Sequence, residues 1–348
     1  MVLIPSSIDD VTASWLREAT GLAVTSARAE QIGAGIGVIG AVYRVHLEGD
    51  GVPPAVVVKL QGLDEAAAFT GTMLRMYIRE VRFYDRMASR VPVRVPNALH
   101  TALDEETSAF VVVMEDMGAL RVVDQVAGMA IADAERAVDR LAAWHATFWG
   151  EGEQLADEGV TVSLADPIYP AILPMVFAEG WEKVTTEMGV PDAVERAGKC
   201  WPDVFAQLLV DLATPPTTMT HGDYRADNIL FTTDDQVALL DFQLSGTASG
   251  AYDLAYFVTQ SLDPEVASAN ERALFDRYVE GLRAGGVPES ALGRLWEDYR
   301  KAALFCLVYP IVAARGMDLT DARQRGLVEC MNARFARAVD ELELDTLL

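Results

Sequence analysis

The chain has 348 residues, of which 51% are hydrophobic and 23% charged, a composition typical of a globular protein and not of a disordered one. The length fits two lobes better than one typical domain. The formal net charge of −24 argues against nucleic acid or an anionic membrane surface as the main partner, because both are bound through basic patches.

The cysteines and the most apolar late segment bear on location. Cys200, Cys306 and Cys330 are widely spaced and form no C-x-x-C pair, which favours reduced thiols in a cytoplasmic protein. The N-terminus lacks a basic stretch followed by an apolar run, so we expect no signal peptide. Leu304–Ala314 is about half the length that a membrane span needs and contains Pro310, so we predict a buried helix there and no membrane insertion.

The first third of the chain alternates between helical and strand patterns. Ser7 followed by Asp10 predicts the cap of an opening helix that Gly21 ends. Strand patterns then run through residues 41–47 and 55–60. Three- and four-residue spacings predict one helix over residues 64–89. Two further strand candidates lie at 98–103 and 108–114.

The remainder reads as mostly helical, apart from a short β-rich stretch at 229–242. A β-rich segment followed by a helical one predicts an α+β protein of two lobes, residues 1–116 and 117–348, joined by a hinge at 115–118.

The strongest chemical signal is the segment H-G-D-Y-R-A-D-N at 221–228, followed by two short apolar strands separated by a turn. If these strands pair, Asn228 and Asp241 fall at the same end of the hairpin, where both could bind magnesium through hard oxygen ligands. Asp223 then lies on the adjoining loop, where it could accept a proton from an attacking hydroxyl. The bland alternative is a hairpin whose acidic residues merely cap turns.

The segment resembles the catalytic loop and metal-binding strand of the aminoglycoside phosphotransferase and choline kinase superfamily, which has a protein-kinase-like fold. The form H-G-D-Y-R-A-D-N-I-L-F followed by D-F-Q is especially similar to the ecdysteroid-kinase-like branch. The resemblance implies that Asp223 is the catalytic base and that Asn228 and Asp241 are magnesium ligands. It also places Arg225 where protein kinases carry a phosphate-contacting lysine.

The first third carries weaker signals of the same kind. Gly35 and Gly37 lie in a glycine-rich run, where the backbone could approach phosphates closely, although an ordinary turn explains the run equally well. Lys59 ends an apolar strand and Glu80 lies on the next helix. The resemblance implies that Lys59 contacts the nucleotide phosphates and that Glu80 pairs with it. A solvated strand end and a solvent-facing helix charge are the alternatives.

Two further segments match the superfamily. Val111–Gly118 resembles its hinge, which implies that backbone groups around Glu115 and Met117 hold adenine. His145 shares a helix face with apolar residues, so we predict a core histidine that supports the catalytic loop. The resemblance further implies that Asp253 hydrogen-bonds that loop.

The sequence therefore predicts an ATP- and Mg²⁺-dependent kinase that phosphorylates a hydroxyl of a small organic molecule. The nucleotide would bind in the first lobe, and the second would carry the catalytic loop, the metal site and the acceptor pocket. A protein kinase is disfavoured, because Gln243 replaces the glycine of D-F-G and no activation segment follows. A catalytically silent nucleotide-binding protein is the other alternative. For the acceptor, the strongly acidic second lobe favours a cation, whereas the aromatic residues between 169 and 181 favour an apolar alcohol, which we slightly prefer.

Overall fold

The computed structural model describes residues 3–32, 40–62 and 64–348. These residues form two compact units. The first comprises the chain up to Arg90, Arg94–Leu120 and Asp241–Leu244, and the second comprises Val91–Val93, Arg121–Leu240 and Ser245–Leu348. The first is built around a β-sheet and the second is mainly helical, which confirms the predicted α+β class.

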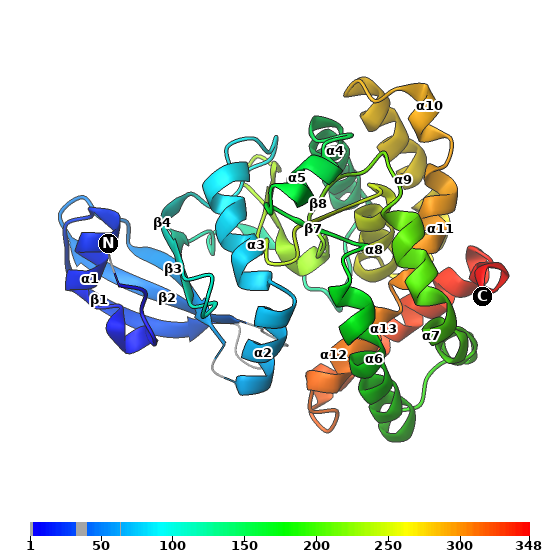
Figure 1. The fold of residues 1–348 in the computed structure, drawn as a ribbon, viewed down its shortest axis with the longest axis horizontal. Helices are drawn as coiled ribbons and strands as arrows, with labels where there is room; N and C mark the ends of the chain where they lie inside the picture. Colours follow the sequence, from blue (N-terminus) through cyan, green and yellow to red (C-terminus); the bar gives the residue numbers. More distant parts are fainter. Residues whose placement is uncertain (1–2, 33–39, 63) are drawn as a thin grey trace. The chain divides into compact units, whose positions relative to one another are not determined.

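A five-stranded antiparallel sheet of order β1-β2-β3-β5-β4 forms the centre of the first unit (Figure 1). Its strands are β1 (Val24–Ile32), β2 (Gly40–Gly49), β3 (Ala55–Gln61), β4 (Ala98–Leu103) and β5 (Phe110–Glu115). The helical elements are a 3-10 turn (Ile8–Asp10), α1 (Ala13–Thr20), α2 (Glu65–Met73), α3 (Met76–Arg82) and a π-helical turn (Phe83–Met87).

Strand alternation divides this sheet into two faces. Along β3, Val56, Val58 and Leu60 are buried in a core that also contains Leu16 of α1. Because successive side chains point to opposite faces, Lys59 belongs to the other face. There the ring of Phe110 stacks on Tyr77 of α3, with centroids 4.6 Å apart. The pattern of β3 therefore directs Lys59 toward the face that α3 covers.

The helix predicted over residues 64–89 is divided into three pieces. Arg75 adopts a left-handed conformation with φ of 53°, which separates α2 from α3. The break exposes the carbonyl of Leu74, and the buried Arg79 guanidinium donates a hydrogen bond to it at 2.6 Å. Ala88 N–H then bonds to Phe83 O, which widens the last turn. Periodicity predicted helical residues here but not these interruptions.

The predicted cap of the opening helix is also wrong in its position. Ser7 and Asp10 form a capping box on the short 3-10 turn, and α1 begins later, where the Thr12 hydroxyl accepts a hydrogen bond from Trp15 N–H. The end is as predicted, because Gly21 adopts the left-handed conformation that terminates helices.

The second unit contains many helices and two small three-stranded sheets, of order β10-β9-β6 and β7-β11-β8 (Figure 1). The strands are β6 (Arg121–Val122), β7 (Val162–Ser163), β8 (Thr218–Thr220), β9 (Ile229–Phe231), β10 (Val237–Leu239) and β11 (Gly246–Ala248). The α-helices are α4 (Ile131–Thr147), α5 (Gly152–Asp157), α6 (Ile168–Glu187), α7 (Asp192–Leu212), α8 (Ala251–Ser261), α9 (Pro264–Ala284), α10 (Glu289–Leu292), α11 (Leu295–Phe305), α12 (Val308–Gly316) and α13 (Ala322–Glu341). Short 3-10 turns occupy Ala226–Asn228 and Leu344–Leu347.

The apolar segment 304–314 crosses a break between two helices and does not form the single buried helix that we predicted. Helix α11 ends at Phe305 and α12 starts at Val308. Pro310 has no N–H to donate to Cys306 O, four residues earlier, and its ring would clash with that carbonyl in a continuous helix. Most of the segment is buried, as predicted. No helix of the described residues has the length and apolar character needed to cross a membrane.

Candidate active site

The β9–β10 hairpin positions Asn228 in the second unit. The two strands are antiparallel and place Ile229 opposite Leu239. Beyond this pair, Leu240 N–H donates a hydrogen bond to Asn228 O at 3.0 Å. Asn228 therefore lies at the end of the hairpin where the chain passes directly into Asp241, as the pairing argument predicted.

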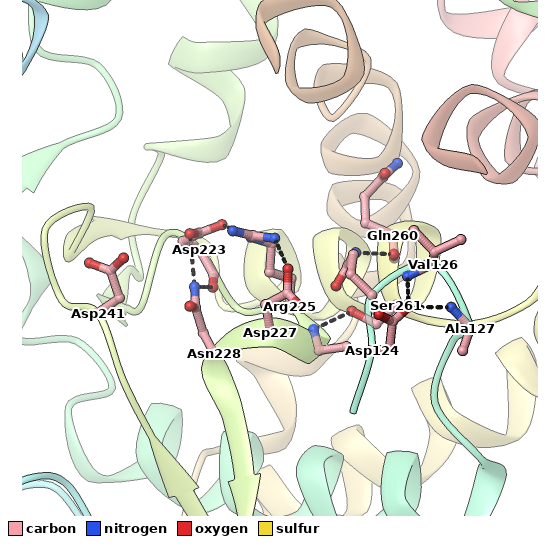
Figure 2. Close-up of polar contacts among 12 residues, drawn as sticks. Asp124, Val126, Ala127, Asp223, Arg225, Asp227, Asn228, Asp241, Gln260 and Ser261 are labelled. Carbon is pink, nitrogen blue, oxygen red and sulfur yellow. Dashed lines mark hydrogen bonds and ion pairs between the residues drawn. The ribbon is translucent and has the colours of Figure 1, made fainter. Parts of the chain in front are cut away.

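Asp223 is a buried carboxylate held by side-chain donors on both oxygens (Figure 2). Its Oδ1 accepts hydrogen bonds from Arg225 Nε at 3.1 Å and from the Tyr256 hydroxyl at 2.9 Å. Its Oδ2 accepts one from Asn228 Nδ2 at 2.8 Å. These donors fix the orientation of the carboxylate, which a base with a fixed approach to its substrate requires.

The same donors keep Asp223 ionised. Burial alone would raise the pKa of Asp223, because it disfavours the charged form. The charges of Arg225 and His221 and the hydrogen bonds from Tyr256 and Asn228 overcome this effect and lower the pKa below its usual value. Asp223 is therefore a carboxylate near neutral pH and can accept a hydrogen bond from an alcohol.

Asn228 directs its amide nitrogen toward Asp223. Nδ2 donates to the backbone oxygen of Asp223 at 2.9 Å as well as to its Oδ2. The amide oxygen is the atom that remains suitable for binding a cation. An amide oxygen is a hard ligand of the kind that magnesium binds together with phosphate and water oxygens. In the described ranges, no group of three or more His, Cys, Asp or Glu side chains is arranged to hold a metal.

Arg225 lies between two aspartates of the same loop. Its Nε contacts Asp223, and its Nη1 donates to Asp227 Oδ2 at 2.7 Å (Figure 2). This arrangement places a positive charge beside the candidate base. The predicted contact between Arg225 and a phosphate stays a prediction.

Asp253 of α8 supports the start of the loop at residues 221–228 through hydrogen bonds. Its Oδ2 accepts a hydrogen bond from His221 N–H at 2.6 Å, and its Oδ1 accepts one from Gly222 N–H at 2.9 Å. His145 is fully buried, and its two ring nitrogens contact Asp253 and the hydroxyl of Tyr278. The predictions of a loop-supporting aspartate and a core histidine are both confirmed.

In the first unit, Lys59 and Glu80 form the pair that the sequence predicted. Lys59 Nζ lies 2.5 Å from Glu80 Oε1 and 3.2 Å from Asp241 Oδ1. The Glu80 side chain is 2% exposed, which excludes the alternative of a solvent-facing charge. Burial alone would lower the pKa of Lys59, but Asp241 and Glu80 raise it above its usual value, so Lys59 stays charged.

Asp241 begins a short segment that packs against α3 and the π-helical turn. Its φ of 66° is unusual for a residue with a side chain, and such conformations often occur at functional positions. The next residue, Phe242, is buried and stacks on Phe83 with centroids 3.6 Å apart. Gln243 Nε2 donates to Asp241 Oδ2 at 3.3 Å. The D-F-Q segment is thus anchored by its aromatic ring.

The other residues predicted to contact the nucleotide are Glu115, Met117, Gly35 and Gly37. The Glu115 carboxylate is paired with Arg94 at 2.6 Å, so any adenine contact here would use the backbone. Met117 is buried, and its carbonyl accepts a hydrogen bond from Leu120 N–H. Gly35 and Gly37 lie outside the described residues.

Comparison with known proteins identifies the group to which this arrangement belongs. Residues 31–287 match the model of a family described as the phosphotransferase enzyme family, a span that includes all the candidate site residues. The chain belongs to this family. The predicted enzyme class is therefore confirmed at the level of a phosphotransferase.

Several solved structures share the fold of this chain. Choline kinase from Cryptosporidium parvum aligns with a TM-score of 0.56 at 12% identity, over 92% of this chain and 91% of that one. Ethanolamine kinase from Plasmodium vivax aligns with a TM-score of 0.54 at 13% identity, over 92% and 83%. A type I macrolide 2'-phosphotransferase gives 0.54 at 14% identity, over 95% and 98%. At these identities the likeness establishes the kinase-like fold.

A curated relative adds little about activity. An uncharacterized protein of Mycoplasma pneumoniae, a homolog of MG356, is 29% identical over 103 residues. The match covers 28% of this chain and spans about a third of the relative's length (36%).

The structure also reveals site residues that the sequence reasoning missed. Tyr256 contacts Asp223 from 33 positions further along the chain, and no local spacing signals this contact. Ser261, at the end of the same helix, accepts a hydrogen bond from Ala226 N–H at 3.0 Å. Asp116 pairs with Arg44 at 2.6 Å and fixes the turn after β5. The sequence feature that could have indicated Asp116 is its charge within the predicted hinge.

Proposed function

We propose that the chain is an ATP-dependent kinase that transfers the γ-phosphoryl group to a hydroxyl of a small organic molecule. The observation that carries this proposal is the Asp223 carboxylate, which is buried, kept ionised and oriented by three side-chain donors. Burying a charged carboxylate costs free energy, so a buried and ionised Asp223 in a phosphotransferase favours a catalytic role for this residue.

The proposed roles follow from the donor and acceptor groups of the candidate site. Asp223 accepts the hydrogen bond of the acceptor hydroxyl and orients it for attack. The charged Lys59, held by Glu80, binds nucleotide phosphates, and Arg225 adds positive charge near the transferred group. Asn228 Oδ1 and the Asp241 carboxylate would hold Mg²⁺, which when bound neutralises phosphate charge. Backbone groups near Glu115 and Met117, and the run containing Gly35 and Gly37, complete the proposed nucleotide site.

For the acceptor, the proposal names a class of molecule and not a single compound. The named relatives act on macrolides, choline and ethanolamine, all of which are small molecules. The resemblance of residues 221–231 and 241–243 to the ecdysteroid-kinase-like branch favours an apolar alcohol. The protein as proposed has no nucleic-acid partner, does not insert into membranes and acts in the cytoplasm.

A phosphotransfer assay tests the proposal. Purified protein is incubated with radiolabelled ATP, Mg²⁺ and a panel of steroid alcohols, choline-like amines, macrolides and amino sugars, and the phosphorylated product is measured. Asp223→Asn keeps the size of the side chain but removes its charge, so we expect kcat to fall by about 10²–10⁴-fold, the usual contribution of a base. Asp241→Asn should also abolish most turnover.

Asp276→Asn is the matched control, because Asp276 is an exposed aspartate on α9 that pairs only with Arg272 of the same helix in the described contacts. It should retain wild-type kcat. Wild-type turnover in the Asp223→Asn protein would overturn the assignment. Binding of ATP, seen as a rise in Tm, without turnover of any acceptor would instead favour the catalytically silent alternative.

A further inference from the structure

Helix α8 contacts the catalytic loop at three points along its length. Asp253 in its first turn accepts hydrogen bonds from His221 and Gly222 N–H, and Ser261 in its last turn accepts one from Ala226 N–H. Between them, the Tyr256 hydroxyl donates to Asp223 Oδ1 at 2.9 Å. The first and last contacts hold the backbone of the loop. Tyr256 contacts its reactive side chain.

The Tyr256 ring is itself held in place by an aromatic neighbour. Tyr256 is 3% exposed and stacks on Tyr309 of α12, with ring centroids 3.9 Å apart and planes 15° apart. The Tyr309 hydroxyl lies 3.4 Å from the carbonyl oxygen of Gly222, the residue before Asp223. Because the ring is stacked and buried, its hydroxyl has little freedom to move away from Asp223.

Tyr256 remains a hydrogen-bond donor under ordinary conditions. Burial raises the pKa of Tyr256 well above its usual value, and the neighbouring charge of Asp223 raises it further. A protonated phenol beside a carboxylate donates its proton to the hydrogen bond and leaves the carboxylate charged. The contact therefore restrains Asp223 without competing for its role as a hydrogen-bond acceptor.

The two oxygens of Asp223 are unequally occupied. Each carboxylate oxygen can accept about two hydrogen bonds. Oδ1 accepts from both Tyr256 and Arg225, whereas Oδ2 accepts a side-chain hydrogen bond from Asn228. An incoming hydroxyl thus finds its remaining acceptor position on Oδ2. Without Tyr256, each of the two oxygens would offer one acceptor position to the incoming hydroxyl.

We propose that Tyr256 is a positioning residue that occupies Asp223 Oδ1 and so directs the acceptor hydroxyl to Oδ2. The inference rests on the proposed kinase function. In the step itself the acceptor O–H bond breaks and its proton passes to Asp223 Oδ2. The acceptor oxygen forms a bond to the γ-phosphorus, and the bond from that phosphorus to the bridging oxygen of the nucleoside triphosphate breaks, releasing the diphosphate. Tyr256 keeps its proton throughout.

Kinetics of the Tyr256→Phe protein test this role. The variant keeps the ring and its stacking but removes the hydroxyl, so we expect kcat to fall by about 10- to 100-fold, as for loss of an outer hydrogen-bond partner, while KM for ATP stays unchanged. In an Asp223→Asn background the same change should alter kcat less than about twofold, because Tyr256 acts only through Asp223. An equal loss in both backgrounds would mean a general structural effect and would overturn the proposal.

Tyr299→Phe provides the matched control. Tyr299 is a fully buried tyrosine whose hydroxyl donates to Glu271 at 2.6 Å. Removing it should lower Tm comparably but leave kcat within about twofold of wild type.

A crystal structure of the Tyr256→Phe protein gives a readout that needs no turnover. We expect the Asp223 carboxylate to rotate about its Cβ–Cγ bond, and an unchanged carboxylate would overturn the positioning role even if the protein proved inactive. Absence of phosphotransfer by the wild-type protein would count against the proposed function alone. An active wild type with an equally active Tyr256→Phe protein would count against this inference alone.

Discussion

At the scale of single residues, the ammonium of Lys59 is the clearest case of a charge whose environment determines its use. The Lys59 side chain is 12% exposed, and its ammonium contacts two carboxylates, those of Glu80 and Asp241. A buried cation that merely closed an ion pair would contribute little net stability, because desolvation offsets most of the attraction. Because Glu80 and Asp241 bring two carboxylates to the single ammonium of Lys59, the group carries excess negative charge, which a bound metal cation would neutralise. This arrangement favours a binding role for Lys59 over a purely structural one.

Glu80→Gln tests whether Glu80 acts by orienting Lys59. The substitution keeps the shape of the side chain but removes the charge that attracts the ammonium, so Lys59 should shift toward Asp241. We expect KM for ATP to rise roughly 10-fold, which corresponds to about 1.4 kcal/mol of binding. The measurement is steady-state kinetics with ATP varied at saturating acceptor.

Glu18→Gln on the exposed face of α1 is the control and should leave KM unchanged. If Glu80→Gln matched the control, the pair would be structural and the nucleotide role of Lys59 would lose its support.

Residues of the site differed in how far the sequence could predict them. Lys59 and Glu80 were predictable because the resemblance to the superfamily implies their pairing, whereas the strand and helix patterns alone left both as solvated charges. Asn228 was predictable because it adjoins the strands of a hairpin. Tyr256 was not, because its contact with Asp223 depends on how α8 packs under the loop, and packing at that separation leaves no local pattern.

At the scale of elements, the packing of α6 against α12 depends on one small residue. A Cβ added at Gly180 of α6 would lie 2.1 Å from the carbonyl oxygen of Ile311 in α12. A backbone atom cannot rotate away as a side chain can. The two helices therefore approach closely because Gly180 has no side chain.

Gly180→Ala should consequently destabilise the protein by about 1–3 kcal/mol, the usual cost of overpacking a core. Gly326→Ala in α13 is the matched control, since an added Cβ meets no atom within 4 Å there. Removing a glycine from this helix should stabilise it by roughly 0.5–1 kcal/mol. Urea denaturation followed by circular dichroism measures both changes. Equal stabilities of the two variants would show that α6 and α12 can separate without cost.

Element boundaries were predicted less well than element types, and the reasons are particular. The break at Arg75 requires a left-handed arginine, and the Leu74 carbonyl next to it accepts a hydrogen bond from the Arg79 side chain, a tertiary contact that periodicity does not register. The break before α12 was marked by Pro310, but its effect falls several residues earlier. Both breaks lie within segments whose helical character was predicted correctly.

At the scale of the whole molecule, the order of strands and helices along the chain was enough to predict the fold class. The β-rich first third, the helical remainder and the hairpin at 229–242 all appear in the structure. The small sheet β7-β11-β8 was not predicted, because its three-residue and two-residue strands are too short to show alternation.

The net charge of −24 predicts how stability responds to salt. At 10 mM ionic strength the screening length is about 30 Å, so like charges repel across the folded protein, and at 150 mM it is about 8 Å. Screening also weakens exposed ion pairs, but each of these contributes only about 0–1 kcal/mol. Because acidic residues outnumber basic ones nearly two to one, we expect relief of repulsion to dominate and Tm to rise by roughly 2 °C.

Differential scanning calorimetry at the two salt concentrations measures this response. A variant with Asp50→Asn, Glu153→Gln and Asp203→Asn removes three exposed carboxylates that lie outside the proposed site. Its net charge of −21 should raise Tm at 10 mM and reduce the rise on adding salt. A fall in wild-type Tm with salt would mean that the surface ion pairs outweigh the repulsion. The excess acidic charge would then serve solubility at no cost in stability, because charge far from zero keeps proteins apart whether or not it strains the fold.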